Sequence, residues 1–206
     1  MVDQYSLASA RSYDGVAGDY LNGWADKRPR GIAQRFAQQA GPEAVVLDVA
    51  SGPGLDVRLL RDMGIKPVSG DLSFGVMQVA QTHHPRGLLA CWDFQRLPFA
   101  DNTFDGIWAP GALHHLPRRA FVPVLKEWMR VQARGPIVLS VPEGDEDLGL
   151  YEDPPLEDPI RASKCTQDQL QGLLLSLGYV GVEVEVRLDP RGTNMRWVHA
   201  WGVAPT

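Results

Sequence analysis

The sequence predicts one doubly wound α/β domain built on a mostly parallel sheet. Short apolar runs alternate with helical stretches along most of the chain, and the runs lack the polar alternation of strands with one wet face. Strands that alternate with helices form parallel sheets with right-handed crossovers. The 206 residues are enough for one such domain and too few for two with separate cores. We therefore expect residues 1–206 to form a single domain.

The expected elements follow from helical spacing, apolar runs and breaking residues. Residues 10–40 are expected to be helical, because Tyr13, Val16 and Tyr20 recur at helical intervals before Gly41-Pro42 breaks the chain. Only a short link separates the last two expected strands, so we expect them to form an antiparallel hairpin at the sheet edge. The expected strands are 44–48, 66–71, 87–92, 104–108, 136–141, 179–187 and 196–203, and the expected later helices are 55–63, 74–83, 119–133 and 167–177.

A change of composition follows the fifth expected strand. Residues 142–165 hold eight acidic side chains and four prolines, so they are not expected to form a core element. We expect a loop at the carboxyl end of that strand, which is the edge at which open α/β sheets bind ligands. Two interpretations stay open here: a solubilising surface loop, or part of a substrate entrance or lid.

The overall composition narrows the class of protein. The formal net charge of −5 argues against an extended nucleic-acid footprint, which would need a basic face. The two cysteines form no CxxC pair and have no metal-ligand spacing, so we expect no metal site and a reducing compartment. The N-terminal residues lack the pattern of a secretory signal, and no apolar run approaches the ~20 residues of a membrane span. We therefore expect a cytoplasmic protein without membrane insertion.

The strongest local signal is the run VVLDVASGPGLDVRLL at residues 45–60. An apolar strand ends in Asp48, and a turn that contains Gly52 and Gly54 leads directly into a helix. Glycine lets the backbone turn sharply and lets a ligand approach without a Cβ in the way. The start of the helix adds unpaired N–H groups and a partial positive charge. The unit predicts a ligand site, although dinucleotide enzymes use the same unit.

Acidic residues also end the second and third expected strands. Asp71 can accept hydrogen bonds from both hydroxyls of a ribose. Asp93, beside Phe94, suits an adenine, which donates from its exocyclic amine and needs apolar cover on its faces. Carboxylates that end neighbouring strands repel one another unless donors reach them. The run FDGIWAPGALHHL at 104–116 adds a His-His pair at the same edge of the sheet.

These motifs resemble the Rossmann-like (class I) S-adenosylmethionine (SAM)-dependent methyltransferases. The similar segments are LDVASGPG, GDLSFGVMQVAQ and WDFQRLPFADNTFDGIWAPGALHHL, and the resemblance extends over about residues 10–204. It is greatest to the branch that contains ubiquinone- and menaquinone-pathway methyltransferases and many small-molecule methyltransferases. The resemblance implies a seven-stranded sheet of order 3-2-1-4-5-7-6, an N-terminal helical lid at 1–40, and SAM as cofactor with S-adenosylhomocysteine (SAH) as product.

The resemblance also implies contacts between the methionine end of the cofactor and the first motif. Asp48 would lie near the methionine amino group. Ala50, Ser51 and Gly52 would form the loop under the methionine and the ribose. Relatives often have glycine where this chain has Ala50. Relatives with alanine at this position also exist, so we expect cofactor binding to survive, with affinity weakened at most. The backbone carbonyl of Ala109 would lie near the methionine end.

The adenosine end is implied in the same way. Asp71 would hold the ribose hydroxyls, and Leu72 would pack on the adenine. Asp93 would accept from the adenine amine, and the Phe94 N–H would meet a ring nitrogen. Tyr20, together with Tyr13, would belong to the lid over the cofactor.

The expected reaction is an in-line displacement in which a nucleophile of a small-molecule acceptor attacks the sulfonium methyl group. Alignment and exclusion of water are then the main tasks of the protein, and a base helps only if the nucleophile arrives protonated. His115 is the first candidate base, with a hydrogen-bonded structural histidine as the alternative. Glu143 is a second candidate base or a substrate anchor, with a plain loop acid as the alternative. Core packing and an aromatic acceptor pocket are both open for Trp24, Trp92, Trp108 and Trp197.

Three other functions stay open at this point. An NAD-dependent oxidoreductase would use the same fold, but its pattern needs a glycine at Val57, and a pyrophosphate site has no use for Asp48 and Asp93. A non-catalytic protein that holds SAM, or merely keeps the fold, is compatible with the same residues. A methyltransferase that acts on RNA or protein would need a basic or flat apolar surface at the pocket mouth. The main prediction is methyl transfer to a small molecule, without a metal.

Overall fold

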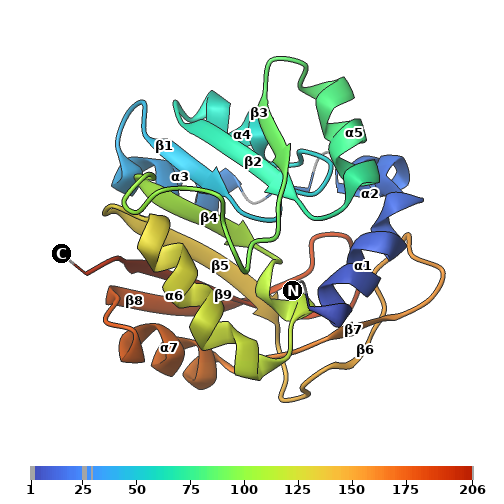
Figure 1. The fold of residues 1–206 in the computed structure, drawn as a ribbon. Helices are drawn as coiled ribbons and strands as arrows, with labels where there is room; N and C mark the ends of the chain where they lie inside the picture. Colours follow the sequence, from blue (N-terminus) through green and yellow to red (C-terminus); the bar gives the residue numbers. More distant parts are fainter. Residues whose placement is uncertain (1–2, 25–26, 29, 206) are drawn as a thin grey trace.

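The computed structural model describes residues 3–24, 27–28 and 30–205 and arranges them around one central sheet (Figure 1). The sheet has seven strands in the order β3-β2-β1-β4-β5-β9-β8. β1 to β5 pair in parallel, whereas β9 pairs antiparallel with both β5 and β8. When only the seven strands of this sheet are numbered along the chain, β8 and β9 become the sixth and seventh strands, and the order is 3-2-1-4-5-7-6. The predicted fold class, including its terminal hairpin, is therefore confirmed.

The observed elements follow the predicted alternation closely, and β2 and α5 have the predicted bounds. The strands are β1 (Val45–Asp48), β2 (Lys66–Asp71), β3 (Leu88–Cys91), β4 (Gly106–Pro110), β5 (Pro136–Pro142), β6 (Gly149–Tyr151), β7 (Ile160–Ala162), β8 (Val180–Leu188) and β9 (Arg196–Val203). The α-helices are α1 (Gln4–Asp14), α2 (Ala17–Trp24), α3 (Arg30–Ala40), α4 (Val57–Asp62), α5 (Phe74–His83), α6 (Phe121–Val131) and α7 (Gln167–Ser176), with 3₁₀ turns at Leu113–His115 and Arg118–Ala120.

The central strands are buried on both faces because they present apolar residues in both directions. In β4, Ile107 packs into the core on one face and Trp108 into the core on the other. In β5, Leu139 packs into the same core as Ile107, and Val138 packs into the same core as Trp108. One core also contains residues of α6 and α7, and the other contains residues of α3 and α4. The uninterrupted apolar runs read from the sequence are thus those of a sheet covered by helices on two sides.

The N-terminal helical region begins earlier than predicted and is divided into α1, α2 and α3. Asp3 caps α1 by accepting a hydrogen bond from the Tyr5 N–H at 2.9 Å, a start signal outside the predicted range. At the other end of α1, Asp14 accepts a hydrogen bond from the Ser73 hydroxyl, which fixes this helix to the start of α5. Figure 1 shows α1 and α2 beside α5, with β6 and β7 on the other side of α1.

The acidic segment contains a small hairpin that was not expected. β6 and β7 form a two-stranded antiparallel sheet apart from the main one. Tyr151, Ile160 and Ala162 are buried, and Tyr13 and Trp197 pack against them. The prediction that this segment lacks a core element was therefore wrong over these residues. A few apolar side chains among the acids are enough to make a small core when α1 and β9 supply the other half.

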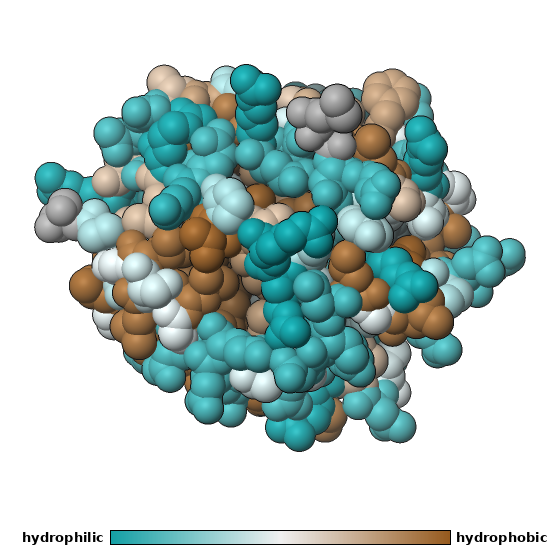
Figure 2. Space-filling model, turned by 60° about the horizontal axis from the view of Figure 1, so that its bottom comes forward, coloured by the Kyte–Doolittle hydropathy of each residue, from teal (hydrophilic) through white to brown (hydrophobic). Residues whose placement is uncertain are grey.

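Apolar side chains on the surface are scattered. Figure 2 shows one face on which hydrophilic residues predominate and apolar residues gather in separate areas. Large exposed apolar side chains come from different elements, among them Phe74 of α5, Leu150 of β6 and Leu188 of β8. Single exposed residues of this kind are ordinary in folded proteins. Among the described residues, no helix is long and apolar enough to cross a membrane.

Candidate functional site

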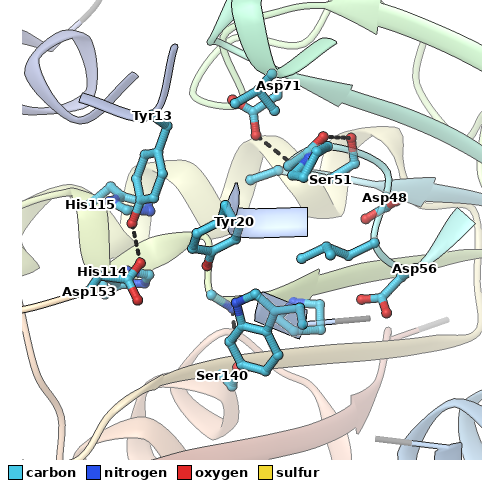
Figure 3. Close-up of a pocket in the computed structure, with 18 of the residues that line it drawn as sticks. Tyr13, Tyr20, Asp48, Ser51, Asp56, Asp71, His114, His115, Ser140 and Asp153 are labelled. Atoms are coloured by element: carbon cyan, nitrogen blue, oxygen red, sulfur yellow. Dashed lines mark hydrogen bonds between the residues drawn. The ribbon is translucent and has the colours of Figure 1, made fainter. Parts of the chain in front are cut away.

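A cavity of about 330 Å³ opens at the carboxyl edge of the sheet. Residues at the ends of β1, β2, β4 and β5 line it, and residues of α1 and α2 cover it. Figure 3 shows the labelled side chains around a central space, with Tyr20 projecting into the middle, Asp71 and Ser51 on one side, and His115 and Asp153 on another. Doubly wound sheets bind ligands at this edge, and the volume is in the range of small-molecule sites.

The Gly-rich turn after β1 forms one wall of the cavity. The Ser51 N–H donates to the Gly70 carbonyl at 3.0 Å, which fastens the turn to β2. Gly52 and Gly54 have φ angles of 56° and 81°, a left-handed conformation that glycine adopts without strain. A Cβ at Gly54 would lie 2.6 Å from the His84 ring. Backbone conformation and close packing therefore both require glycine in this turn.

Asp71, at the end of β2, braces this turn and also faces the cavity. Its carboxylate accepts hydrogen bonds from the Gly52 N–H at 3.1 Å and from the Ser73 N–H at 3.0 Å. Burial raises the pKa of Asp71, and the backbone donors oppose this rise. The carboxylate thus joins the turn after β1 to the start of α5 and presents acceptor oxygens to the cavity.

Asp48 is buried at the end of β1, and its Oδ2 has no hydrogen-bond partner among the described residues. Burial raises the pKa of Asp48 to about 8, and the nearby Asp56 carboxylate adds to the rise. Asp56 is itself held by Arg28 and by the Trp108 Nε1–H, which donates at 2.8 Å. Asp48 is therefore mostly protonated near pH 7, and a positive charge in the cavity would favour its ionisation.

The lid presents aromatic rings to the cavity. The rings of Tyr13 and Tyr20 meet edge to face with centroids 5.3 Å apart, and the centroid of Trp24 lies 6.3 Å from that of Tyr20. The guanidinium groups of Arg28 and Arg191 lie 5.0 Å and 4.4 Å from the centre of the Trp24 ring. Trp24 is thus held by two cations, each at a distance typical of a cation–π contact.

Two neutral imidazoles form another part of the wall. His114 and His115 lie in the 3₁₀ turn after β4, and their ring centroids are 3.9 Å apart. Burial lowers the pKa of His115 to about 4 and holds the pKa of His114 well below its usual value. The Nδ1 atoms of both rings have no hydrogen-bond partner among the described residues. Each neutral ring can accept at one nitrogen and donate at the other, so both are available to a ligand.

The structure brings most of the predicted site residues to this cavity. The nine that line it are Tyr20, Asp48, Ala50, Ser51, Gly52, Asp71, Leu72, Phe94 and His115. Tyr13, predicted to belong to the lid, also lines it. Of the four tryptophans considered, Trp24 and Trp197 line the cavity, whereas Trp92 and Trp108 are buried in the core.

Two predicted cofactor contacts lie outside the lining. The Asp93 carboxylate accepts hydrogen bonds from the backbone and side-chain N–H groups of Gln95 at 2.9 and 3.2 Å. Ala109 is buried within β4, and the next two residues, Pro110 and Gly111, line the cavity instead. A strand end is uncertain by a residue or two when read from sequence, which accounts for the shift.

Glu143 also lies outside the lining. Its carboxylate forms an ion pair with Arg196 at 2.9 Å, and its N–H donates to the Arg196 carbonyl at 2.8 Å. The pairing of β5 with β9 thus continues past the predicted end of the strand and holds Glu143 against β9. A base must reach the acceptor, and this position does not face the cavity.

Several residues of the site were not predicted. Asp153 accepts a hydrogen bond from the Tyr13 hydroxyl, and Arg191 pairs with Asp153. Arg28 pairs with Asp56 across the cavity mouth. These partners lie 28 to 140 residues apart in the sequence. No local spacing could have indicated them, because only the folded arrangement brings them together.

No group of three or more His, Cys, Asp or Glu side chains placed to hold a metal ion occurs among the described residues. The polar groups that face the cavity are instead suited to an organic ligand. They combine carboxylates at one end with imidazoles and aromatic rings at the other.

Residues 47–139 match the family model described as "Methyltransferase domain". A demethylmenaquinone methyltransferase of Renibacterium salmoninarum is 33% identical over 119 residues, which are 57% of this chain and 49% of that protein. The chain thus spans about half the length of this relative.

Two solved structures show the same fold. The Burkholderia thailandensis 1,6-didemethyltoxoflavin-N1-methyltransferase, solved with 1,6-didemethyltoxoflavin and SAH, has a TM-score of 0.72 at 22% identity and matches 100% of this chain and 92% of its own. The [4+2]-cyclase SpnF has a TM-score of 0.69 at 18% identity, and the match covers 98% of this chain and 97% of SpnF.

The fold, the matched domain and the relative agree with one another. The matched residues contain the turn after β1, Asp71 and the two histidines that surround the cavity. Residues 47–139 thus match the methyltransferase-domain model, and the chain resembles the class I SAM-dependent methyltransferases of the menaquinone-pathway branch.

Proposed function

We propose that the protein transfers a methyl group from SAM to a small-molecule acceptor by in-line displacement. The observation that carries the proposal is a single lidded cavity with ribose-type acceptors at one end and neutral imidazoles at the other. Asp71 and the Gly52 turn lie at the first end, and His114 and His115 at the second. We assign the first end to the nucleoside of SAM and the second end to the acceptor.

The residues present fit the cofactor. Asp71 would accept from the ribose hydroxyls, and Leu72 together with the buried Phe94 would cover the adenine. Asp48 has a carboxylate oxygen without a hydrogen-bond partner among the described residues, which suits the cationic methionine end. Ala50 and Ser51 would lie under the methionine. The predicted contacts of Asp93 and Ala109 stay predictions, although neither residue lines the cavity.

When bound, SAM supplies a methyl group on a sulfonium, and the protein supplies alignment and exclusion of water. Tyr13, Tyr20 and Trp24 cover the cavity and keep water out. Neutral histidines also matter, because an imidazolium would repel a sulfonium placed beside it. A pKa of about 4 keeps His115 uncharged near pH 7. This low pKa supports a role in holding the hydrogen of the nucleophile rather than in removing it fully before attack.

The acceptor would lie against His114, Pro110 and Trp197, on the side of the cavity away from Asp71. Trp197 and His114 meet edge to face with centroids 5.4 Å apart, and Trp197 has an indole N–H without a partner among the described residues. An apolar wall with a few polar atoms is typical of small-molecule sites. We therefore propose that the acceptor is a small molecule. Glu143 stays a predicted base, although it does not line the cavity. The cytoplasmic location stays a prediction.

The test is calorimetric titration of the purified protein with SAM, SAH and NAD, followed by methyl transfer from labelled SAM to a panel of small acceptors. We expect micromolar binding of SAM and SAH and none of NAD. His115→Gln, which keeps the size and polarity of the side chain, should lower turnover more than it lowers SAH affinity.

Binding of SAH without turnover on any acceptor would favour the non-catalytic alternative. SpnF, a [4+2]-cyclase, has a similar fold, so this fold is also found in a protein with another activity. Binding of NAD in place of SAM and SAH would overturn the proposal.

A further inference from the structure

Three distant parts of the chain meet in one buried polar contact at the cavity mouth. Asp153 follows β6, and its carboxylate accepts a hydrogen bond from the Tyr13 hydroxyl of α1. The same carboxylate pairs with Arg191, which lies in the connection between β8 and β9. The side chains of Asp153 and Arg191 are only 4% and 7% exposed. We call this group of three side chains the Asp153 contact (Figure 3 shows its Tyr13–Asp153 part).

Opening of the Asp153 contact would leave the Arg191 guanidinium paired. Arg191 is also held within its own connection by Asp189, whose Oδ2 lies 2.7 Å from Nη2. The Pro154 carbonyl accepts from Arg191 at 3.1 Å. A buried arginine that lost its sole counter-charge would be strongly destabilising. When the contact opens, Arg191 keeps Asp189 as its counter-charge, whereas the Asp153 carboxylate loses both partners and has to be hydrated as the lid moves away.

The Asp153 contact also sets the position of groups that face the ligand. The Tyr13 ring meets the His115 ring edge to face, with centroids 5.7 Å apart and planes at 83°. Arg191 lies over the ring of Trp24. Tyr13 also packs against the small apolar core formed by Tyr151, Ile160 and Ala162. A shift at Asp153 would therefore move both the lid and the wall that carries His115.

We propose that Asp153 is a positioning residue that closes the N-terminal helices over the cavity by holding Tyr13 and Arg191, and that this contact opens when ligand enters and leaves. The proposal gives the acidic segment a specific task at the site entrance. It rests on the proposed function only for the identity of the ligand. In this proposal Asp153 acts on the ligand through Tyr13 and Arg191.

The first experiment measures amide hydrogen exchange of α1 in the free protein. Tyr13→Phe deletes one hydroxyl and leaves the Asp153–Arg191 pair in place, whereas Asp153→Asn weakens both links. The matched control is Tyr5→Phe on the same helix, because the Tyr5 hydroxyl has no hydrogen bond among the described contacts. We expect roughly tenfold faster exchange of α1 in both test variants, as for loss of one hydrogen bond to a charged group, and no change in the control.

The second experiment measures SAH release by stopped-flow fluorescence, with parallel thermal unfolding to confirm that each variant folds. Release should be several-fold faster in Tyr13→Phe and Asp153→Asn, and the double variant should exceed Asp153→Asn only slightly, because both changes remove one shared contact. Unchanged α1 exchange in both variants, or a double variant with fully additive effects, would overturn the proposal. If α1 exchange rises but SAH does not bind even the parent protein, the contact stands and the proposed function fails.

Discussion

Asp71 has two roles, and substitution of this residue should affect both. Its carboxylate accepts from the backbone N–H groups of Gly52 and Ser73, and it faces the cavity. Asp71→Ala should weaken SAH binding by about 1–3 kcal/mol, since hydrogen bonds to the ribose and the brace on the turn are both lost. Asp93→Ala should cost less, because Asp93 does not line the cavity.

Calorimetry with SAH checks this prediction. The control is Asp62→Ala, a solvent-exposed acid whose one ion pair within the described part of the chain is the i,i+4 contact with Arg58 at 3.8 Å. A parent-like affinity for Asp71→Ala would show that the ribose site has been assigned to the wrong residue.

Asp48 should make the affinity for SAM depend on pH. With a pKa of about 8 it is mostly protonated at pH 7, and the methionine ammonium together with the sulfonium of SAM would favour its ionised form. Binding of SAM should then release a proton, so affinity should rise with pH, by at most about tenfold per unit, until about pH 8. SAH lacks the sulfonium charge, so its affinity should rise less.

Titrations with both ligands at about pH 6.5 and about pH 8.5 give the ratio of their affinities. Asp48→Asn cannot ionise at this position and should make the ratio independent of pH. A flat ratio in the parent protein would show that Asp48 does not sense the sulfonium.

At the scale of elements, the contact between β2 and β3 places a strict demand on one residue. A Cβ at Gly70 would lie 2.5 Å from the Ala90 carbonyl oxygen and 2.5 Å from the Trp92 ring. Gly70→Ala should therefore destabilise the protein by about 2 kcal/mol, as expected for an overpacked core position. Gly172→Ala in α7 is the matched comparison, because open space surrounds that position.

Denaturant unfolding should show the two substitutions to have opposite signs. Gly172→Ala should stabilise the protein by about 0.5–1 kcal/mol through helix propensity and lower entropy of the unfolded chain. If Gly70→Ala is tolerated without loss of stability, β2 and β3 are packed less tightly than the structure indicates.

The elements could be predicted from the sequence where their signals are local. Ser73 caps α5, and the side chain of Thr166 together with Gln169 forms a capping box on α7. The β6–β7 hairpin escaped prediction, because its strands are short and its apolar residues gain stability only against Tyr13 and Trp197. Long-range packing of this kind leaves no periodic signal in a short segment.

At the scale of the whole molecule, the buried histidines and Asp48 predict a stability maximum near pH 6.5. Burial lowers the pKa of His115 and of His199 to about 4, so the unfolded state binds more protons between about pH 4 and 6.5, and stability rises with pH there. The raised pKa of Asp48 acts in the opposite sense, because the folded state binds more protons up to about pH 8. Above about pH 6.5 the histidines are neutral in both states, so only the raised pKa of Asp48 acts there, and stability should fall as pH rises to about 8.

Guanidinium unfolding at about pH 5, 6.5 and 8 measures the effect. Asp48→Asn should abolish the decline between pH 6.5 and 8 and make the rise of stability below pH 6.5 steeper, because the opposing Asp48 term is removed in both ranges. A parent protein that is most stable at pH 8 would show that Asp48 is ionised in the folded state.

The sequence by itself determined the sheet, the Gly-rich turn and the acids that end the strands. These features are local: apolar runs specify buried strands, glycine specifies the turn, and the carboxyl ends of parallel strands meet at one edge. For that reason Asp48, Asp71 and His115 could be assigned to one cavity before the structure was known.

Only the tertiary structure decided how the cavity is closed and which predicted residues face it. Glu143 is held against β9 by its ion pair with Arg196, and Tyr13 meets Asp153 across 140 residues of chain, with Arg191 paired to the same carboxylate. The burial that lowers the pKa of His115 and raises that of Asp48 also arises from contacts with distant segments. Such contacts depend on where whole elements pack, and no local pattern of residues carries that information.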